Sequence, residues 1–186
     1  DENLFLTEFK SQTPVSIELG NSPKEGFEGP NPPIQLIEFA DFQCPACGMA
    51  ARYMHRLLKV YGNKVQLVFK YFPLDSSCNR VMKSPMHPFG CSSARAAYCA
   101  QQQNRFSDFY RLLFTRRMEI TADNIRKWAE ELGLDLQKFD GCLASPESLA
   151  AVQADVEAGI KAGLQSTPTF FVNGKKVEGA ITEEKL

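Results

Sequence analysis

The sequence predicts a mixed α/β fold in which a block of helices interrupts the sheet. A strand, a helix and a second strand follow one another between residues 34 and 72, a helical pattern later runs to residue 162, and residues 169–178 have the pattern of a β-hairpin. Two strands joined by a helix pair in parallel through a right-handed crossover, whereas a hairpin pairs its strands antiparallel. The expected sheet is therefore mixed, and 186 residues suffice for one domain with a large insertion.

The central strand is expected at Ile34–Ala40, because a nearly continuous apolar run is typical of a strand that is covered on both faces. A helix is expected at Pro45–Tyr61, where apolar residues recur every three or four positions, proline suits the first turn and Gly62 suits the end. The second strand is expected at Val65–Phe72, which is rich in β-branched and aromatic residues and ends at Pro73.

The remaining elements are shorter or lie in the interrupting block. Residues 4–9 are predicted to form a helical turn, residues 15–19 a half-exposed strand, and the glycine- and proline-rich residues 20–33 a loop. Helices are expected at residues 89–103, 106–116, 121–132, 136–143 and 146–162. Strands at 169–172 and 175–178 are joined by an Asn173-Gly174 turn, and residues 182–186 have the pattern of a first helical turn that a truncated chain does not complete.

Composition and charge exclude several classes of protein. Lys and Arg number 21 against 22 Asp and Glu, without a basic run, so nucleic acid is not an expected partner. No apolar stretch approaches the roughly 18 residues needed to span a bilayer, and the acidic Asp1-Glu2 does not begin a signal peptide. Six cysteines indicate an oxidising, extracytoplasmic compartment such as a bacterial periplasm, and a removed signal or membrane anchor upstream of residue 1 would fit.

Two of the cysteines, Cys44 and Cys47, are placed for redox chemistry. Cys44 lies at the expected N-terminus of the helix, where unpaired backbone N–H groups and the helix dipole stabilise a thiolate below the ordinary thiol pKa of about 8.5. A thiolate attacks disulfides, whereas a thiol does not. Cys47 lies one helical turn further on, so it is able to close a ring with Cys44 or to resolve a mixed disulfide.

Half of a zinc site is the alternative interpretation of a single C-x-x-C motif. Zinc needs further Cys or His ligands, commonly in a second pair at short spacing. Neither His55 and His87 nor the other four cysteines have that spacing, so no metal is expected.

The other four cysteines are interpreted first as structural disulfides. Cys99 and Cys142 lie on separate predicted helices, and a bond between them would tie the helical block together, while Cys78 and Cys91 would close the irregular segment before it. Four cysteines allow three pairings, so the sequence alone does not fix this one. In the rival interpretation, Cys78 and Cys91 form a second, exposed pair that relays electrons to Cys44 and Cys47.

The order of the elements and several short motifs resemble the thioredoxin fold of the DsbA-like thiol:disulfide oxidoreductase family. Residues 94–106 and 139–143 also resemble DsbA-like proteins found beside, or fused to, membrane vitamin K epoxide reductase homologues. The resemblance implies a thioredoxin-like domain of residues 1–73 and 163–186, with residues 74–162 as an inserted helical domain. Its most specific motifs are Cys44-Pro45-Ala46-Cys47, Glu38 six residues earlier, Lys70 on the next strand, and Thr167-Pro168 before the hairpin.

The resemblance assigns substrate contacts to four residues. Pro168 is expected to be cis and to lie against the cysteine pair, where it leaves the backbone of Thr167 free to pair with an extended substrate strand. An ordinary trans proline that opens a strand is the alternative. Pro45 and Ala46, between the two cysteines, are expected to line the same substrate surface.

The resemblance also implies a buried acid and base, Glu38 and Lys70, beneath the redox pair. A carboxylate there takes or delivers the proton that Cys47 must exchange, and its pKa would be raised by burial and lowered by an ammonium partner. Taken one at a time, each residue also fits a partly exposed charge at a strand end.

Two departures from the family pattern bear on the direction of electron flow. The DsbA-type oxidases carry a Val before the cis proline and a His inside the C-x-x-C motif, whereas this chain has Thr167 and Ala46. Without that His the thiolate has one stabilising donor fewer, which predicts a weaker oxidant. Thr before the proline also occurs in isomerases and reductases of this fold. Such isomerases dimerise through an added N-terminal domain, for which the residues before Val15 are too few, so a monomer is expected.

These inferences combine into an extracytoplasmic thiol:disulfide oxidoreductase that oxidises dithiols in reduced or unfolded proteins. The resemblance implies no soluble cofactor, and it implies reoxidation by a membrane quinone-linked oxidase of the vitamin K epoxide reductase or DsbB kind. The first alternative is a disulfide reductase or isomerase on the same fold, and the second is a non-catalytic or metal-carrying thioredoxin-like module.

Overall fold

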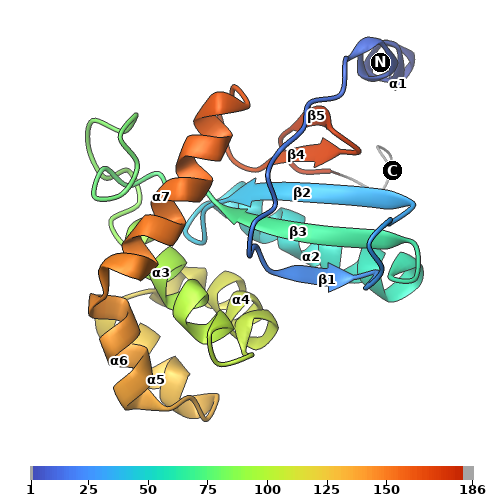
Figure 1. Cartoon of the computed structure of the whole chain (residues 1–186). Coiled ribbons are helices and arrows are strands. Elements are labelled where there is room, and N and C mark those ends of the chain that lie inside the picture. The colour runs from blue at the N-terminus through green and yellow to red at the C-terminus, as the bar shows by residue number, and fades with distance from the viewer. Residues whose placement is uncertain (1, 182–186) are drawn as a thin grey trace.

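The computed structural model describes residues 2–181 and contains a five-stranded mixed sheet in the order β1-β3-β2-β4-β5 (Figure 1). The central strands β2 and β3 are parallel, with Ile34 opposite Val65 and Ala40 opposite Tyr71, and the other neighbours are antiparallel. The strands are β1 (Lys24–Gly26), β2 (Ile34–Ala40), β3 (Val65–Tyr71), β4 (Thr169–Val172) and β5 (Lys175–Glu178).

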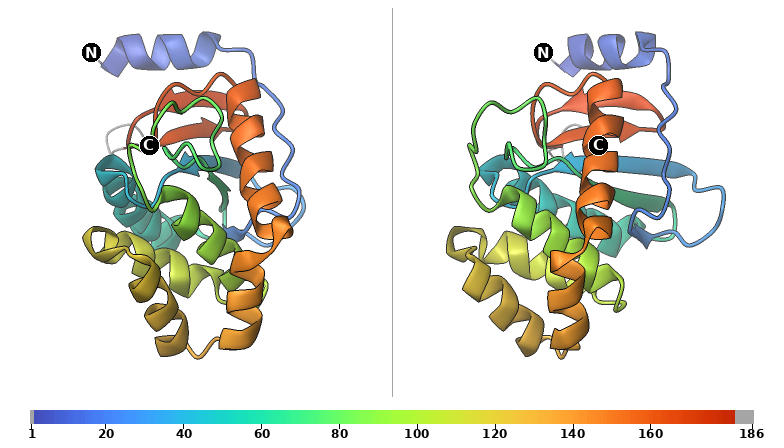
Figure 2. Two further views of the ribbon diagram at one scale, coloured as in Figure 1. Left: turned by 90° about the vertical axis from the view of Figure 1, so that its left-hand side faces the viewer. Right: turned by 60° about the vertical axis from the view of Figure 1, so that its left-hand side comes forward.

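Helices cover both faces of the sheet, and a helical block extends past one end of it (Figures 1 and 2). Helix α2 (Pro45–Tyr61) connects β2 with β3 across one face, and α7 (Pro146–Lys161) runs along the opposite face. The N-terminal helix α1 (Glu2–Ser11) lies beside β5. The rest of the block consists of α3 (Gly90–Gln101), α4 (Phe106–Thr115), the short 3-10 helix η1 (Arg117–Glu119), α5 (Ala122–Glu131) and α6 (Leu136–Ala144).

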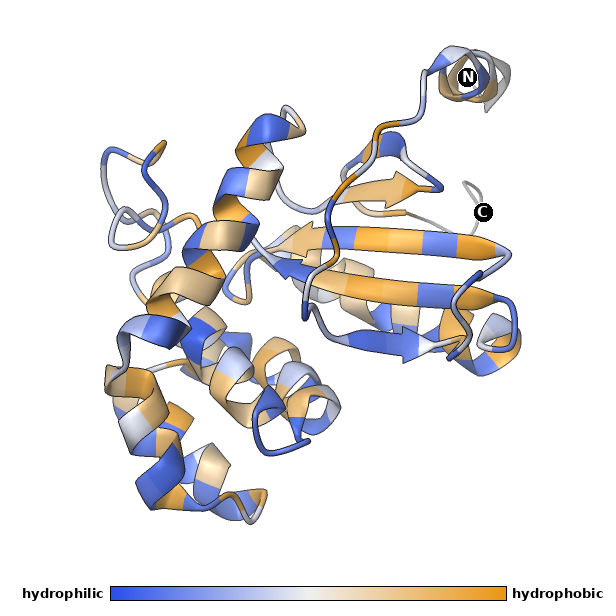
Figure 3. Cartoon of the chain, in the orientation of Figure 1, coloured by the Kyte–Doolittle hydropathy of each residue, from blue (hydrophilic) through white to orange (hydrophobic). Residues whose placement is uncertain are grey.

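The apolar character of β2 and β3 follows from this double cover (Figure 3). On the α2 face, aromatic rings join the sheet to the helical block, and the rings of Phe69 on β3 and Tyr110 on α4 lie 5.2 Å apart between centroids. On the α7 face, Phe39 packs edge-on against Phe72 and Phe171. Burial of such side chains is the main favourable term in folding, so it fixes the block against the carboxyl end of β2.

The predicted architecture is confirmed, with differences near the N-terminus. The helix and strand patterns from residue 34 to residue 178 match the observed elements within a few residues, including the Asn173-Gly174 turn, whose φ angles are 47° and 83°. Residues 15–19 are not a strand, although Val15 N donates to the carbonyl oxygen of Gly174 at 2.9 Å. The predicted loop 20–33 instead contains β1, and the helical turn predicted at residues 4–9 is the longer α1. The turn predicted at 182–186 lies outside the described residues.

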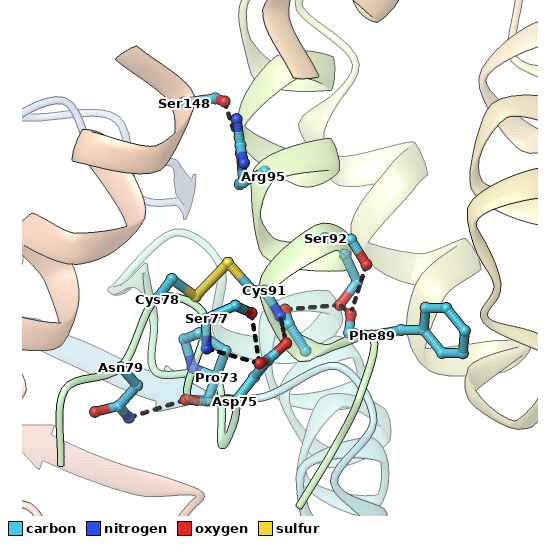
Figure 4. The surroundings of a disulfide bond; sticks show 12 residues. Pro73, Asp75, Ser77, Cys78, Asn79, Phe89, Cys91, Ser92, Arg95 and Ser148 are labelled. Carbon is cyan, nitrogen blue, oxygen red and sulfur yellow. Dashed lines mark hydrogen bonds between the residues drawn. A yellow bond between two sulfur atoms is a disulfide. The ribbon is translucent and has the colours of Figure 1, made fainter. Parts of the chain in front are cut away.

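Both expected disulfides are present, Cys78–Cys91 and Cys99–Cys142. The first closes the irregular segment 74–90 onto the start of α3, where Asp75 Oδ2 also accepts from Cys91 N at 3.0 Å (Figure 4). The second joins α3 to α6. Within residues 2–181, no helix is both long and apolar enough to cross a membrane.

We predict that removing the α3–α6 disulfide destabilises the chain more than removing the other one. Its loop of 43 residues gives a chain-entropy contribution of about 4 kcal/mol, against about 3 kcal/mol for the 13-residue loop of Cys78–Cys91. Urea unfolding of the Cys99→Ala/Cys142→Ala and Cys78→Ala/Cys91→Ala double variants measures both values. An unchanged free energy of unfolding in the first double variant would contradict a structural role.

Candidate redox site

Cys44 is the N-cap residue of α2, where the chain leaves β2. A short turn follows Ala40. In it the carbonyl oxygen of Asp41 accepts from Cys44 N at 3.1 Å, and the side-chain Oδ1 of Asp41 accepts from Gln43 N at 2.7 Å. Cys44 has extended backbone angles (φ −68°, ψ 123°), and Pro45 begins the helix. Proline fits because the first helical N–H has no partner within the helix and the ring fixes a helical φ. The turn therefore places the Cys44 sulfur against the first turn of α2.

The Cys44 sulfur is stabilised as a thiolate. Its pKa is lowered to about 6, first by a hydrogen bond from the Cys47 side chain, with smaller contributions from Thr167 and from the Cys47 backbone N–H, which lies 3.4 Å from Sγ. Burial and the charge of Asp41 raise this pKa, but they do not outweigh the hydrogen bonds. Cys44 is 6% exposed. At pH 7 it is therefore mostly ionised and retains contact with solvent.

Cys47 differs from Cys44 because it is fully buried. Burial raises its pKa far above the ordinary thiol value, and the neighbouring Cys44 raises it further. Both cysteines are free in this structure, so it represents the dithiol state. Cys47 thus keeps its proton and donates a hydrogen bond to the Cys44 thiolate, so Cys44 is the nucleophile of the pair.

Glu38 lies on β2 beneath the pair and is fully buried. Burial raises its pKa to about 8, and the charge of Glu25 adds to this effect, while the hydrogen bond from Tyr110 opposes it. Tyr110 Oη lies 3.4 Å from Glu38 Oε2, and Oε1 has no hydrogen-bond partner among the described residues. Glu38 also raises the pKa of Cys47. Near neutral pH this carboxyl group is mostly protonated, and it is close enough to Cys47 to act on its titration.

Lys70 does not accompany Glu38, which corrects the prediction of an acid and base together beneath the pair. Glu38 is in register with Phe69, so Lys70 faces the opposite side of the sheet, because successive strand residues alternate faces. There Lys70 Nζ donates to Asp155 Oδ1 on α7 at 3.1 Å and to Ser22 Oγ at 3.0 Å. Lys70 therefore fastens α7 to β3.

The predicted substrate residues lie together at the redox pair. The Thr167–Pro168 peptide bond is cis, and the carbonyl oxygen of Thr167 lies 3.6 Å from Cys44 Sγ. Pro45 is exposed and Ala46 is half-buried. The residues predicted to contact substrate, Pro45, Ala46, Thr167 and Pro168, thus lie around the Cys44 sulfur.

A His–Asp pair beside Cys44 is absent from the sequence-based prediction. His87 Nδ1 lies 2.9 Å from Asp41 Oδ2, which also accepts from Leu74 N at 2.6 Å. This hydrogen bond raises the pKa of His87, and the negative charges of Asp41 and Cys44 raise it further, whereas burial lowers it. A second hydrogen bond joins the end of the loop 74–90 to the turn before α2, because Gln43 Oε1 accepts from Phe89 N at 2.7 Å. The loop 74–90 thus places a histidine with a raised pKa beside the redox pair.

Only a weak signal in the sequence points to these residues. His87 is one of two histidines, and the C-x-x-C motif contains none, but the contact with Asp41 spans 46 residues and requires the folded loop. Tyr110 likewise appears in the sequence only as part of an apolar helix face. Within residues 2–181, no group of three or more His, Cys, Asp or Glu side chains is placed to hold a metal ion.

A protein-family model described as thioredoxin matches residues 29–186. The chain therefore belongs to the thioredoxin family, in its DsbA-like group. The Na(+)/H(+) antiporter NhaA 3 of Salinispora tropica is 33% identical to it over 154 residues, which are 83% of this chain and 22% of that protein. The chain thus spans only about a fifth of the length of this curated relative.

Solved structures show the same fold. BdbD from Bacillus subtilis, in its oxidised form, has a TM-score of 0.73 at 18% identity, over 89% of this chain and 89% of that chain. The thiol-disulfide exchange protein alpha-DsbA2 from Wolbachia pipientis has a TM-score of 0.73 at 15% identity, over 97% of this chain and 91% of that chain. These likenesses confirm the thioredoxin-like fold with a helical insertion ahead of the C-terminal hairpin.

We predict that Glu38→Gln stabilises the dithiol form at pH 7 by on the order of 3 kcal/mol and has little effect at pH 4. The folded pKa of about 8 exceeds the value of about 4.3 for an unfolded glutamic acid. The carboxyl group therefore costs the folded state little below pH 4 and progressively more as the pH rises toward 8. Urea unfolding under reducing conditions at both pH values measures the difference. The exposed Glu130→Gln is the control, and an equal gain at both pH values would contradict a raised pKa.

We predict that His87→Gln raises the pKa of Cys44 by about 0.5 to 1, because glutamine retains a donor for Asp41 but removes the positive charge. The thiolate absorbance at 240 nm, followed against pH, measures this value. The matched control is His55→Gln, which changes an exposed histidine on α2. If both variants titrate like the parent protein, the charge of His87 has no part in stabilising the thiolate.

Proposed function

We propose that this chain is an extracytoplasmic thiol:disulfide oxidoreductase that oxidises dithiols in reduced or unfolded proteins. The observation that carries the proposal is the unequal state of the two cysteines. Cys44 is a thiolate with a pKa of about 6 that keeps 6% of its surface exposed, whereas Cys47 is a fully buried thiol whose pKa is raised. A thiolate that is stable on the enzyme is a good leaving group, so disulfides pass readily from such a pair to a substrate.

The reaction starts from the Cys44–Cys47 disulfide. A substrate thiolate attacks Cys44 Sγ, the bond to Cys47 breaks, and Cys47 leaves as a thiolate that takes a proton from Glu38. A second substrate thiolate then attacks the substrate sulfur of the mixed disulfide and releases Cys44 as a thiolate. Two electrons pass from the substrate dithiol to the enzyme, and a new substrate disulfide is formed. Glu38 fits the proton transfer because it is buried beside Cys47 and has a pKa of about 8.

Substrate binding is assigned to the backbone next to the cis proline. Thr167 is half-buried, its carbonyl oxygen lies against Cys44, and Pro168 has no N–H to interfere. An extended peptide that pairs with this backbone places its own sulfur beside Cys44 Sγ. Because main-chain pairing is independent of sequence, it suits an enzyme for many unfolded substrates.

Reoxidation requires a partner that accepts two electrons. We assign this role to a membrane quinone-linked oxidase of the vitamin K epoxide reductase or DsbB kind. A location at the outer face of a membrane is supported by the two structural disulfides and by relatives that are named as Na(+)/H(+) antiporters. The proposal treats the chain as a monomer.

A reductase or isomerase is the second candidate, and it is favoured by one specific observation. Thr167 and Ala46 replace the Val and His of the DsbA-type oxidases. His87 offsets part of this difference, because Asp41 and Cys44 raise its pKa and a protonated imidazole beside Cys44 favours the thiolate. We therefore place the oxidase first.

We predict a reduction potential for the Cys44–Cys47 pair that is more positive than about −180 mV, between those of protein disulfide isomerase and DsbA. Equilibration with glutathione buffers, read by alkylation of the two cysteines, measures it, and oxidation of a reduced dithiol peptide tests the activity. The Cys47→Ser variant, incubated with the disulfide form of the peptide, is expected to accumulate a mixed disulfide, because the Cys44 thiolate breaks the peptide disulfide and no Cys47 thiol remains to release it. A potential near the thioredoxin value of about −270 mV would overturn the oxidase assignment in favour of the reductase.

A further inference from the structure

An open groove of about 930 Å³ lies between α2 and α4. It begins at Gly48 and Met49, one helical turn after Cys44, and its far end is formed by Arg56. Helix α4 packs near β3, whereas Thr167 precedes β4, and these two strands lie on opposite sides of β2. The groove is therefore on the other side of α2 from the backbone assigned to substrate pairing. Figure 1 shows α2 behind the sheet with α4 below it.

The walls of the groove are basic. Arg52, Arg56 and His55 come from α2, and Arg111 comes from α4, while no Asp or Glu occurs among the described residues that line it. Helix α2 as a whole contains three Arg or Lys residues, in addition to His55, and no acidic residue. The chain as a whole carries a formal charge of only −1, so the positive charge of this face comes from the uneven distribution of basic and acidic residues over the molecule. Clefts lined by one sign of charge concentrate ligands of the opposite sign.

Only one acidic side chain on α4 opposes this charge. Asp108 lies 2.9 Å from Arg105 and 3.9 Å from Arg111, so it is shared between two guanidinium groups. The guanidinium of Arg56 stands 4.9 Å from the centroid of the Tyr53 ring, which holds it at the wall of the groove. The groove therefore presents the guanidinium groups of Arg52 and Arg111 to carboxylates, and Arg is the residue best suited to bind them in pairs.

The shape of the groove suits an extended polypeptide better than a flat membrane surface. From Gly48 to Arg56 the helix rises about 12 Å, which is the length of about four extended residues. Between the charges it offers the side chains of Tyr53, Tyr110 and Phe114. A lipid headgroup layer would meet the arginines only at the rim, whereas a peptide chain enters the hollow.

We propose that this groove binds an acidic segment of the protein substrate, about two to six residues from the cysteine that reacts with Cys44. The inference rests on the proposed function and adds a preference among its substrates. Pairing beside Thr167 accepts any sequence, and the groove selects those that carry Asp or Glu next to the reacting cysteine. Charge complementarity of this kind acts on encounter and binding, so it changes KM and the rate at low substrate concentration.

The test uses the full chain, in its disulfide form, and two dithiol peptides. They differ only in four residues that follow the reacting cysteine, which are acidic in one peptide and lysine in the other. We expect kcat/KM to be about tenfold higher for the acidic peptide at low ionic strength, and the ratio to fall toward one at about 0.5 M salt. Moving the acidic residues to the other side of the cysteine shows which chain direction enters the groove.

Arg52→Glu is expected to reduce kcat/KM for the acidic peptide about fivefold and to leave the rate with the lysine peptide unchanged or higher. Arg111→Glu, on the opposite wall, is expected to act in the same way. The matched control is Lys59→Glu, which makes the same charge change at an exposed position of α2 outside the groove. Equal losses in Arg52→Glu and Lys59→Glu would assign the preference to net charge and overturn the groove.

The outcomes also separate this inference from the function on which it rests. If neither peptide is oxidised, the proposed function fails. If both are oxidised at equal rates, the function stands and the groove has no part in substrate choice. Co-sedimentation with vesicles that contain anionic lipid tests a membrane surface as the partner of the groove. If the protein binds these vesicles, Arg52→Glu abolishes the binding and the two peptides are oxidised equally, the assignment of the groove to a polypeptide is overturned.

Discussion

The Cys44 thiolate is stable because two donors converge on one sulfur, the Cys47 thiol and the Cys47 backbone N–H, while Thr167, before the cis proline, lies against the same sulfur. Each of them comes from a different structural requirement. The helix N-terminus supplies the unpaired N–H groups, the buried position keeps the Cys47 proton in place, and the hairpin brings Thr167 across from a distant part of the chain. Without this convergence Cys44 would be an ordinary buried thiol, and burial alone would make it less acidic.

The helical block supports the site through the loop 74–90. Asp41 begins the turn that positions Cys44, but its carboxylate also raises the pKa of Cys44. His87 lies against the same carboxylate, which raises the pKa of the imidazole. The disulfide Cys78–Cys91 closes this loop onto the start of α3, so the position of His87 depends on the inserted block. The insertion therefore contributes to the chemistry as well as to the size of the substrate surface.

The sequence was sufficient for the architecture because most of its elements have strong local patterns. The periodicity and the Pro45 start fix α2, and the Asn173-Gly174 turn fixes the hairpin. Strand β1 escaped prediction because its three residues form an edge strand only through pairing with β3, and they include Gly26 in the left-handed region with φ 88°. The cysteines could be read from spacing, whereas His87 and Tyr110 enter the site through contacts across 46 and 72 residues, which local patterns do not record.

The position of Lys70 shows how a single step of register decides the chemistry of a buried acid. Had Lys70 faced the same side of the sheet as Glu38, its ammonium group would have lowered the pKa of the carboxyl group and kept it ionised at neutral pH. An ionised Glu38 has no proton to give to the Cys47 thiolate that leaves during disulfide exchange. Since Lys70 pairs with Asp155 on the other face, burial determines the pKa of Glu38, and Tyr110 offers only a neutral hydroxyl. The carboxyl group is thereby held protonated in the pH range in which Cys44 is already a thiolate, so one side of the sheet provides both the good leaving group and the proton donor.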